Sequence, residues 1–126
     1  MNRRPHPRLP RPFSCRRFAA GEAVRVAVRG ELDILTVPRL DRALRRAESD
    51  ADSIVLDLRE LEFVDSSGAH LLLAANRRIR EAGGQMTIVR STCGADRFFT
   101  LIGLDRELDL VERLPPVPFS PARPAA

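Results

Sequence analysis

The stretch LDLRELEFVDSSG, residues 56–68, marks the passage from a buried strand to a helix. Residues 53–58 form the short, β-branched and apolar run of a central strand, and residues 61–64 return to the core after the charged pair Arg59-Glu60. Small polar residues then precede residues 67–82, where apolar side chains recur at spacings of three and four until two glycines end the pattern. The stretch therefore predicts a strand, a polar turn and a helix in succession.

Two strands and a helix are predicted on the N-terminal side of this junction. Residues 13–18 can form an edge strand, and residues 23–29 alternate valines on one face with arginines and an alanine on the other. Gly21-Glu22 supplies the hairpin turn between them. Residues 36–50 form an amphipathic helix with Thr36 as its cap and a proline in its first turn.

The C-terminal side continues the alternation of strands and helices. Residues 85–89 are predicted as a strand, residues 95–102 as a short helix, and residues 108–114 as a final strand or a last helical turn. Strands that alternate with helices favour right-handed crossovers. The predicted fold class is α/β, with a mixed, mainly parallel sheet of about four to five strands and about three to four helices packed chiefly on one face.

The chain has 126 residues, enough for one domain but too few for two. Residues 1–12 hold four prolines and four arginines, and residues 115–126 hold five prolines. Both compositions disfavour regular structure. We therefore expect a disordered arm at 1–12, one domain at 13–114 and a disordered tail at 115–126.

The net charge of +4 comes from the termini rather than the domain. Residues 18–114 hold 14 arginines against 17 acidic residues, so this part is mildly acidic. A basic footprint for nucleic acid is absent, and sequence-specific binding of nucleic acid is not expected. The arginine-rich arm is either a weak, salt-sensitive contact for nucleic acid or an acidic partner, or an extension without a role.

Several classes of function are disfavoured by composition. The chain has no lysine, which a P-loop, a protein kinase and a Schiff-base enzyme each need. Cys15 and Cys93 are isolated, so they predict reduced thiols and no metal site. No stretch is apolar enough for a membrane helix or a signal peptide, and we expect a cytoplasmic protein without membrane contact or cofactor.

The polar turn is the candidate functional site. A strand-to-helix junction presents free backbone amides, and Ser67 can bond back to the first turn while Ser66 is left exposed. Gly68 lacks a side chain and so lets a partner or an added group approach the backbone. Spacing alone favours the interpretation that Asp65, Ser66 and Ser67 only cap the helix, since capping serines are common.

Four motifs together resemble those of STAS domains. VDSSG at 64–68 is similar to the family's DSSG signature, and GELD at 30–33 is similar to its GELD turn. GGQMT at 83–87 and FFTLIGL at 98–104 resemble the segments that follow. The four occur in the expected order and cover about residues 13–114. The chain departs from common members in three ways: His70 lies in the signature helix, residues 91–94 read STCG, and lysine is missing.

The resemblance implies an anti-sigma-factor antagonist, also called an anti-anti-sigma factor. In such members the first serine of DSSG is phosphorylated by a partner that is both an anti-sigma factor and a serine kinase, and that position is Ser66. A serine phosphatase would reset the switch. The resemblance places Glu31, Asp33, Asp65, Ser66, Ser67 and Gly68 at the partner surface, while Glu31 and Asp33 are also compatible with a solvated acidic turn. It implies no catalytic residue, and we expect the free protein to be a monomer.

Three alternatives compete with this interpretation. A serine hydrolase built on Ser66 or Ser67, His70 and Asp65 lacks the G-x-S-x-G motif, and its residues share one turn. A receiver domain with Asp57 or Asp65 as phosphoacceptor lacks the lysine that such domains need. The third alternative is a STAS regulatory subunit of a stress-signalling scaffold or of a lipid or anion transport system. Met86 and the phenylalanines are expected in the core rather than at a cofactor.

Overall fold

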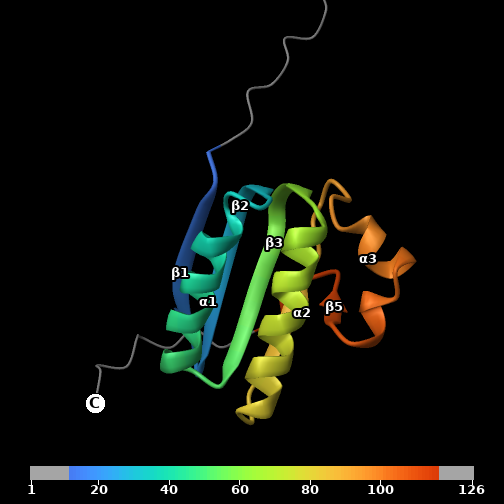
Figure 1. Ribbon diagram of the computed structural model, residues 1–126. Helices are drawn as coiled ribbons and strands as arrows, with labels where there is room; N and C mark the ends of the chain where they lie inside the picture. The colour runs from blue at the N-terminus through green and yellow to red at the C-terminus, as the bar shows by residue number, and fades with distance from the viewer. Residues whose placement is uncertain (1–11, 117–126) are drawn as a thin grey trace, which may run out of the picture.

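A computed structural model describes residues 12–116. The predicted alternation of strands and helices is confirmed, with an additional 3-10 turn, η1, near the end (Figure 1). In chain order the elements are β1 (Ser14–Ala20), β2 (Ala23–Leu32), α1 (Val37–Asp50), β3 (Ser53–Val64), α2 (Ser66–Glu81), β4 (Gln85–Val89), α3 (Arg97–Leu101), η1 (Leu104–Arg106) and β5 (Asp109–Val111). The expectations for the arm at 1–12 and the tail at 115–126 fall almost wholly on residues outside the described part.

The five strands form one mixed sheet in the order β1-β2-β3-β4-β5. β1 and β2 are antiparallel and form a hairpin in which Ala20 pairs with Ala23. Gly21 adopts a φ of 64° in its turn, a conformation that glycine reaches without steric cost. The remaining neighbours are parallel, so the carboxyl ends of β2, β3 and β4 lie at one edge of the sheet. The last element, for which the sequence left a strand and a helical turn open, is the strand β5.

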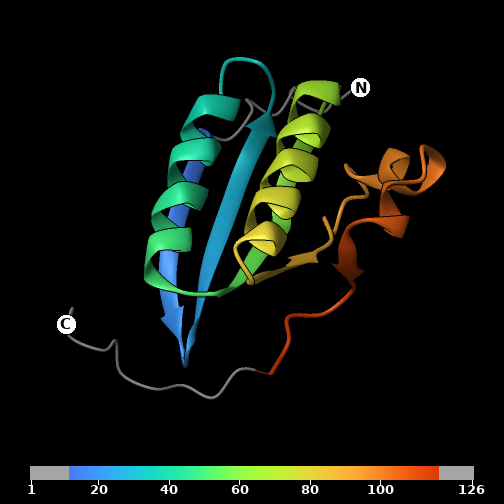
Figure 2. The same ribbon diagram turned by 60° about the horizontal axis from the view of Figure 1, so that its bottom comes forward.

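Helices α1 and α2 lie side by side over the same face of the sheet in both ribbon views (Figures 1 and 2). Their apolar faces are fully buried, as shown by Leu40 and Leu44 of α1 and Leu72 of α2. These side chains pack on the alternate residues of the strands that share their side, such as Val26 and Leu56. The short helix α3 lies beyond α2, on the side of β5. We call the opposite side of the sheet, over which no helix of residues 12–116 lies, the open face.

Strand β3 differs from the sequence-based expectation. The charged pair Arg59-Glu60 was predicted to interrupt it, yet the strand runs unbroken over Ser53–Val64. The interruption is confined to the pairing with β2, where the register moves from Ala27↔Asp57 to Arg29↔Glu60. One extra residue in β3 is accommodated there as a bulge. The backbone stays extended because β2 continues to pair with β3 as far as Val64, although the pairing with β4 ends at Asp57.

Candidate functional site

Asp65 starts helix α2. It has extended backbone angles, and its Oδ1 atom accepts a hydrogen bond of 3.1 Å from the Gly68 amide. The helix therefore begins at Ser66, one residue before the predicted start, and Asp65 rather than Ser67 is the capping residue. The prediction that Ser67 caps the first turn was wrong, because a cap must precede the helix and Ser67 already lies inside it.

Ser66 is exposed, as predicted, at the first position of the helix. The amides of the first turn and the helix dipole make this end locally positive. The Ser66 side chain is left open to solvent by the rest of residues 12–116, whereas Ser67 beside it is half-buried. The most accessible hydroxyl of the motif is therefore that of Ser66.

Gly68 is buried and contributes to the core rather than to an open surface. A Cβ atom at this position would lie 2.6 Å from Val64 Cγ2 and 2.9 Å from Leu32 Cδ2, both closer than van der Waals contact allows. The sequence-based explanation, that Gly68 leaves room for a partner or an added group to approach the backbone, was therefore wrong. The space that its missing side chain leaves is filled from within, by the ends of β2 and β3.

The loop between β2 and α1 is held together by Asp33 and Thr36. Asp33 Oδ1 accepts hydrogen bonds from the amides of Leu35, at 2.9 Å, and Thr36, at 3.1 Å. The Thr36 hydroxyl donates to the Glu31 carbonyl at 2.7 Å and accepts from the Asp33 amide at 2.9 Å. Thr36 occupies the capping position of α1, but its side chain does not cap the helix as predicted because the hydroxyl is used by the loop.

The two sequence motifs meet in space. The Asp65 amide donates to the Leu32 carbonyl at 3.2 Å, so the loop that contains Asp33 lies against the start of α2. Glu31 also lies at this edge, paired in register with Phe63. By strand alternation, its side chain is directed to the open face, away from Leu32. The structure therefore brings Asp33, Asp65 and Ser66 together and places Glu31 on the other side of the same edge.

Large apolar side chains are exposed around this edge. Ile34 is 73% exposed and Leu35 is 82% exposed, both in the loop held by Asp33. Phe63 is 47% exposed, and Phe18 lies outside the core cluster, so the expectation that the phenylalanines are core residues was wrong for these two. We call the group Ile34, Leu35, Asp65 and Ser66 the Ser66 surface. Exposed apolar residues that cluster around a polar motif are typical of a protein contact.

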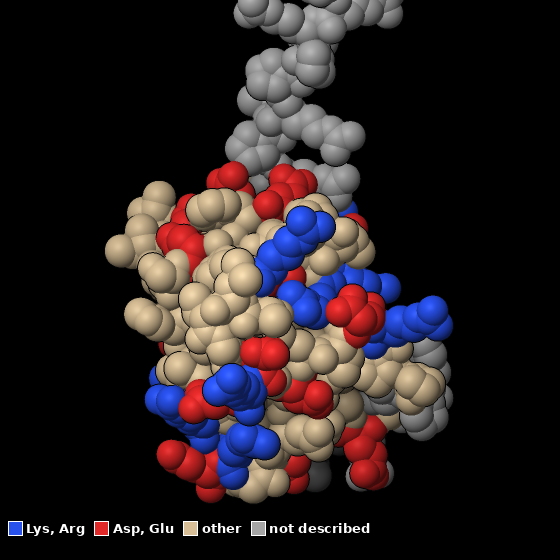
Figure 3. Space-filling view, turned by 90° about the vertical axis from the view of Figure 1, so that its right-hand side faces the viewer, with Lys and Arg blue, Asp and Glu red and all other residues tan. Residues whose placement is uncertain are grey.

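A second pair of exposed apolar side chains lies at the end of α3. Leu101 is 84% exposed and Ile102 is 60% exposed. Figure 3 shows the face on this side of the molecule, where a broad uncharged area extends over the upper part and charged side chains border it. Neither residue was singled out from the sequence, because their exposure depends on how the short helix packs.

Asp57 and His70 are residues that the receiver-domain and serine-hydrolase alternatives would use. Asp57 lies within β3 rather than at its end, and both of its carboxylate oxygens accept hydrogen bonds from arginines. His70 is exposed on α2.

No group of three or more His, Cys, Asp or Glu side chains in the described part of the chain is arranged to hold a metal ion. Among the helices of residues 12–116, none combines the length and apolar character that crossing a bilayer requires.

Comparison with known families now decides the classification. A family model described as "Mlab, STAS domain" matches residues 15–112. The chain belongs to the STAS domain family. The match covers nearly all of the described residues and includes both motifs of the candidate site. The similarity found from the motifs alone is therefore confirmed.

Relatives of this STAS domain carry names that concern sigma factors. An anti-sigma F factor antagonist of Paenibacillus polymyxa is 32% identical over 83 residues, which are 63% of this chain and 69% of that protein. The crystal structure of an anti-sigma factor antagonist from Mycobacterium paratuberculosis is 26% identical, with a TM-score of 0.75 over 82% of this chain and 88% of that one. SpoIIAA in its unphosphorylated form is 22% identical, with a TM-score of 0.63 over 79% of this chain and 88% of that one, and shows the shared fold.

Proposed function

We propose that this STAS domain is an anti-sigma-factor antagonist whose partner binds at the Ser66 surface. Unphosphorylated, it binds an anti-sigma factor that is also a serine kinase, and so frees a sigma factor to activate transcription. The kinase then uses ATP to phosphorylate Ser66, which ends the complex, and a serine phosphatase restores the free hydroxyl. The chain itself contributes no catalytic residue to these steps.

The observation that carries the proposal is the place of Ser66. Its hydroxyl is exposed at the first turn of α2, and the exposed side chains of Ile34 and Leu35 lie in the loop packed beside that turn. A kinase that binds the apolar side chains has the hydroxyl within its contact area. The names of the relatives in Paenibacillus polymyxa and Mycobacterium paratuberculosis support the same class of partner.

Phosphorylation of Ser66 has opposite effects on the complex and on the fold. A phosphate adds about −1.5 to −2 charge directly beside the carboxylate of Asp65, which a tightly packed interface cannot hydrate. The positive end of α2 offsets part of that charge within the domain, by about 0.3 to 1 kcal/mol. The modified protein therefore stays folded while the contact is lost.

Charge also defines the partner. Asp65 and Asp33 border Ser66, and Glu31 lies at the same sheet edge, so a partner with arginine or lysine side chains around an apolar centre fits best. Of the two remaining expected contact residues, half-buried Ser67 lies beside Ser66 at the edge of the proposed contact, while buried Gly68 supports it from beneath by letting α2 pack against Leu32 and Val64.

The test is an affinity capture from lysate of the source cell with Ser66→Ala and Ser66→Asp baits. The Ala bait should retain an anti-sigma factor with kinase activity, and the Asp bait should lose it. Capture of the same stress-scaffold or transport proteins by both baits would instead support the alternative, a regulatory subunit that does not depend on Ser66. Thr100→Asp, which adds the same charge to exposed α3, is the matched control and should capture as the wild type does.

A further inference from the structure

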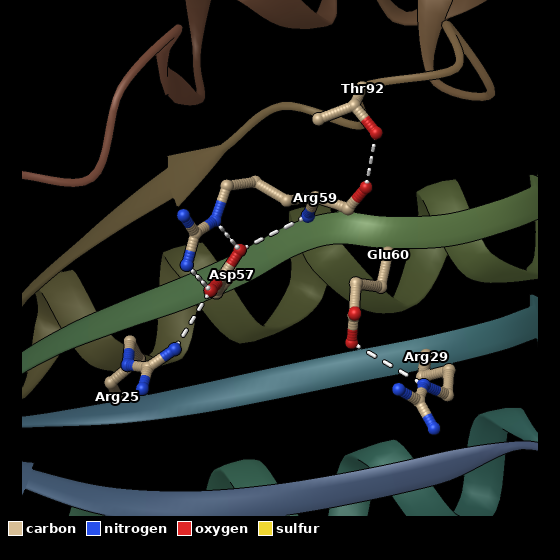
Figure 4. A network of polar contacts seen from close by, with 6 residues as sticks. All are labelled: Arg25, Arg29, Asp57, Arg59, Glu60 and Thr92. Atoms are coloured by element: carbon tan, nitrogen blue, oxygen red, sulfur yellow. Dashed lines mark hydrogen bonds and ion pairs between the residues drawn. The ribbon is translucent and has the colours of Figure 1, made fainter.

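The open face of the sheet is hollowed near its centre. The cavity has a volume of about 440 Å³ and is open to solvent on one side. We call it the arginine groove, and its polar and aromatic lining is Arg16, Phe18, Arg25, Asp57, Arg59, Glu60 and Thr92. They come from three neighbouring strands and from the segment that follows β4, which Figure 4 shows in part. None of these residues belongs to the Ser66 surface.

Asp57 holds two of the arginines in place. Arg59 donates from Nε to Asp57 Oδ1 at 2.9 Å and from an Nη atom to Asp57 Oδ2 at 2.8 Å. Arg25, on the neighbouring strand, donates to the same Oδ2 at 3.0 Å (Figure 4). The Asp57 side chain is 5% exposed, whereas Arg25 is 25% exposed and Arg59 is 41% exposed. Solvent in the groove therefore meets the guanidinium groups rather than the Asp57 carboxylate, and the acidic group that it reaches is Glu60, which is 56% exposed.

Arg16 adds a third cation to the same place. Its guanidinium carbon lies 5.4 Å from the centre of the Phe18 ring, and that of Arg25 lies 4.4 Å from it. Within residues 12–116 no ion pair joins Arg16 to a carboxylate, while Arg29 at the rim is paired with Glu60. The lining thus holds three guanidinium groups and two carboxylates, Asp57 and Glu60, and Glu60 is also paired with Arg29, so the groove keeps a positive charge.

Hydrogen-bond capacity is left over in the groove. Each guanidinium has five N–H donors, and the bonds to Asp57 use two donors of Arg59 and one of Arg25. A concave site whose lining has a net positive charge raises the local concentration of anions. Arginine forks that are already fixed by a carboxylate lose little freedom when they bind a second anion.

We propose that the arginine groove binds a phosphate group, as inorganic phosphate or as a small phosphomonoester. The outer N–H groups of Arg16, Arg25 and Arg59 bind the phosphate oxygens, and Asp57 is a positioning residue that orients two of the arginines. Phe18 forms the apolar floor between the arginines of β1 and β2. The groove lies well away from Ser66, since the seven residue steps of β3 from Asp57 to Val64, at a rise of about 3.3 Å each, span about 23 Å.

The experiment is a titration of the full chain with inorganic phosphate, and separately with glycerol 2-phosphate, at constant ionic strength kept by sodium chloride. Backbone amide shifts in the nuclear magnetic resonance spectrum are the readout. We expect saturable shifts at Arg25, Asp57 and Arg59, and an affinity about tenfold lower in Arg16→Gln, the loss of one charge-assisted contact. Arg16 is exposed, so its replacement leaves the fold intact. Arg42→Gln, an exposed arginine of α1, is the matched control and should bind as the wild type does.

Three results would overturn the proposal: shifts that rise without saturation, equal affinity in the wild type and Arg16→Gln, or saturable binding of a hexaglutamate peptide without binding of phosphate. Saturation by glycerol 2-phosphate but not by inorganic phosphate would support the site and identify the ester as its ligand. Ser66→Asp should leave phosphate binding unchanged, so the groove is tested independently of the proposed switch.

Discussion

The Asp65 amide donates a hydrogen bond of 3.2 Å to the Leu32 carbonyl, which joins the end of β3 to the end of β2. Leu32 also fills the space beside Gly68, where a Cβ atom would lie 2.9 Å from its side chain. The loop after β2 and the first turn of α2 are thereby packed as one unit. Ser66 is held at a fixed place relative to Ile34 and Leu35, as a recognition surface requires.

Gly68→Ala tests this packing. The added methyl would overlap Val64 and Leu32, and overpacking of this kind costs about 1–3 kcal/mol. We expect the free energy of unfolding, measured with urea, to fall by that amount. Ser67→Ala removes only a hydroxyl from the preceding position and should change the free energy of unfolding by less than about 0.5 kcal/mol. An unfolding energy unchanged in Gly68→Ala would mean that this contact is not close.

Replacement of Ile34 and Leu35 by serine should separate binding from stability. Both side chains are largely exposed, so the thermal midpoint should stay within a few degrees of the wild type. Loss of two apolar contacts should weaken binding of the anti-sigma kinase by at least about tenfold, as measured by calorimetry. Leu114→Ser, at an exposed leucine after β5, is the control and should bind normally. Unchanged affinity in the double variant would place the interface elsewhere.

Asp57 should make the stability depend on acid. Burial raises the pKa of Asp57, but the hydrogen bonds and charge of Arg59, with Arg25, outweigh burial and hold the pKa below its ordinary value of 3.8. A lowered pKa stabilises the folded state above pH 3.8, and this contribution is lost as the pH falls through the folded-state pKa. Between about pH 5 and about pH 3, the unfolding energy should therefore fall less in Asp57→Asn than in the wild type.

Asp57→Asn also removes the ion pairs with the arginines, which lowers the free energy of unfolding at every pH. The quantity to compare between Asp57→Asn and the wild type is therefore the slope of the unfolding energy against pH. Asp105→Asn, at an exposed carboxylate of η1, should keep the wild-type slope. Equal slopes in Asp57→Asn and the wild type would show that the Asp57 pKa is the same in the folded and unfolded chains.

Cys15 should be protected from alkylation in the folded protein. Burial raises the pKa of its thiol from 9.0 to about 11, although the charge of Arg39 acts in the opposite direction. At pH 8 about one thiol in a thousand is then ionised, and the thiolate is the reactive form. Iodoacetamide should modify Cys93, which is exposed, well before Cys15, with the sites identified by mass spectrometry. In Cys93→Ser, rapid modification of Cys15 without urea would contradict this order.

Much of the fold follows from local patterns. The spacing of apolar residues in α2 and the alternation of valines in β2 depend only on residues close in sequence. α2 lies within one residue of its predicted bounds, and β2 begins where predicted but continues through Gly30 and Glu31 to Leu32, residues that were expected in a turn. The position of Ser66 was predictable for the same reason, since a polar turn between a strand and a helix exposes its first residues. Which residue caps α2 was not predictable from the sequence, because Asp65, Ser66 and Ser67 are all suitable caps and tertiary packing selects among them.

The arginine groove depends on contacts distant in sequence. Arg25 reaches Asp57 across 32 residues only because Ala27 pairs with Asp57 in the sheet, and the bulge after Asp57 changes how Arg59 is presented. Register of this kind is set by the whole sheet rather than by a motif. The exposure of Phe63 was missed for the same reason, as it follows from which face of β3 the helices cover.

The most direct test of the proposed switch compares the affinity of the anti-sigma kinase for the Ser66-phosphorylated and the unmodified protein by calorimetry. Phosphate beside Asp65 in a packed interface should cost several kcal/mol, and we expect the affinity to fall by about 100-fold or more. Far-ultraviolet circular dichroism should be the same for both forms, because the fold is retained. Equal affinity for the two forms would contradict control of this STAS domain through Ser66.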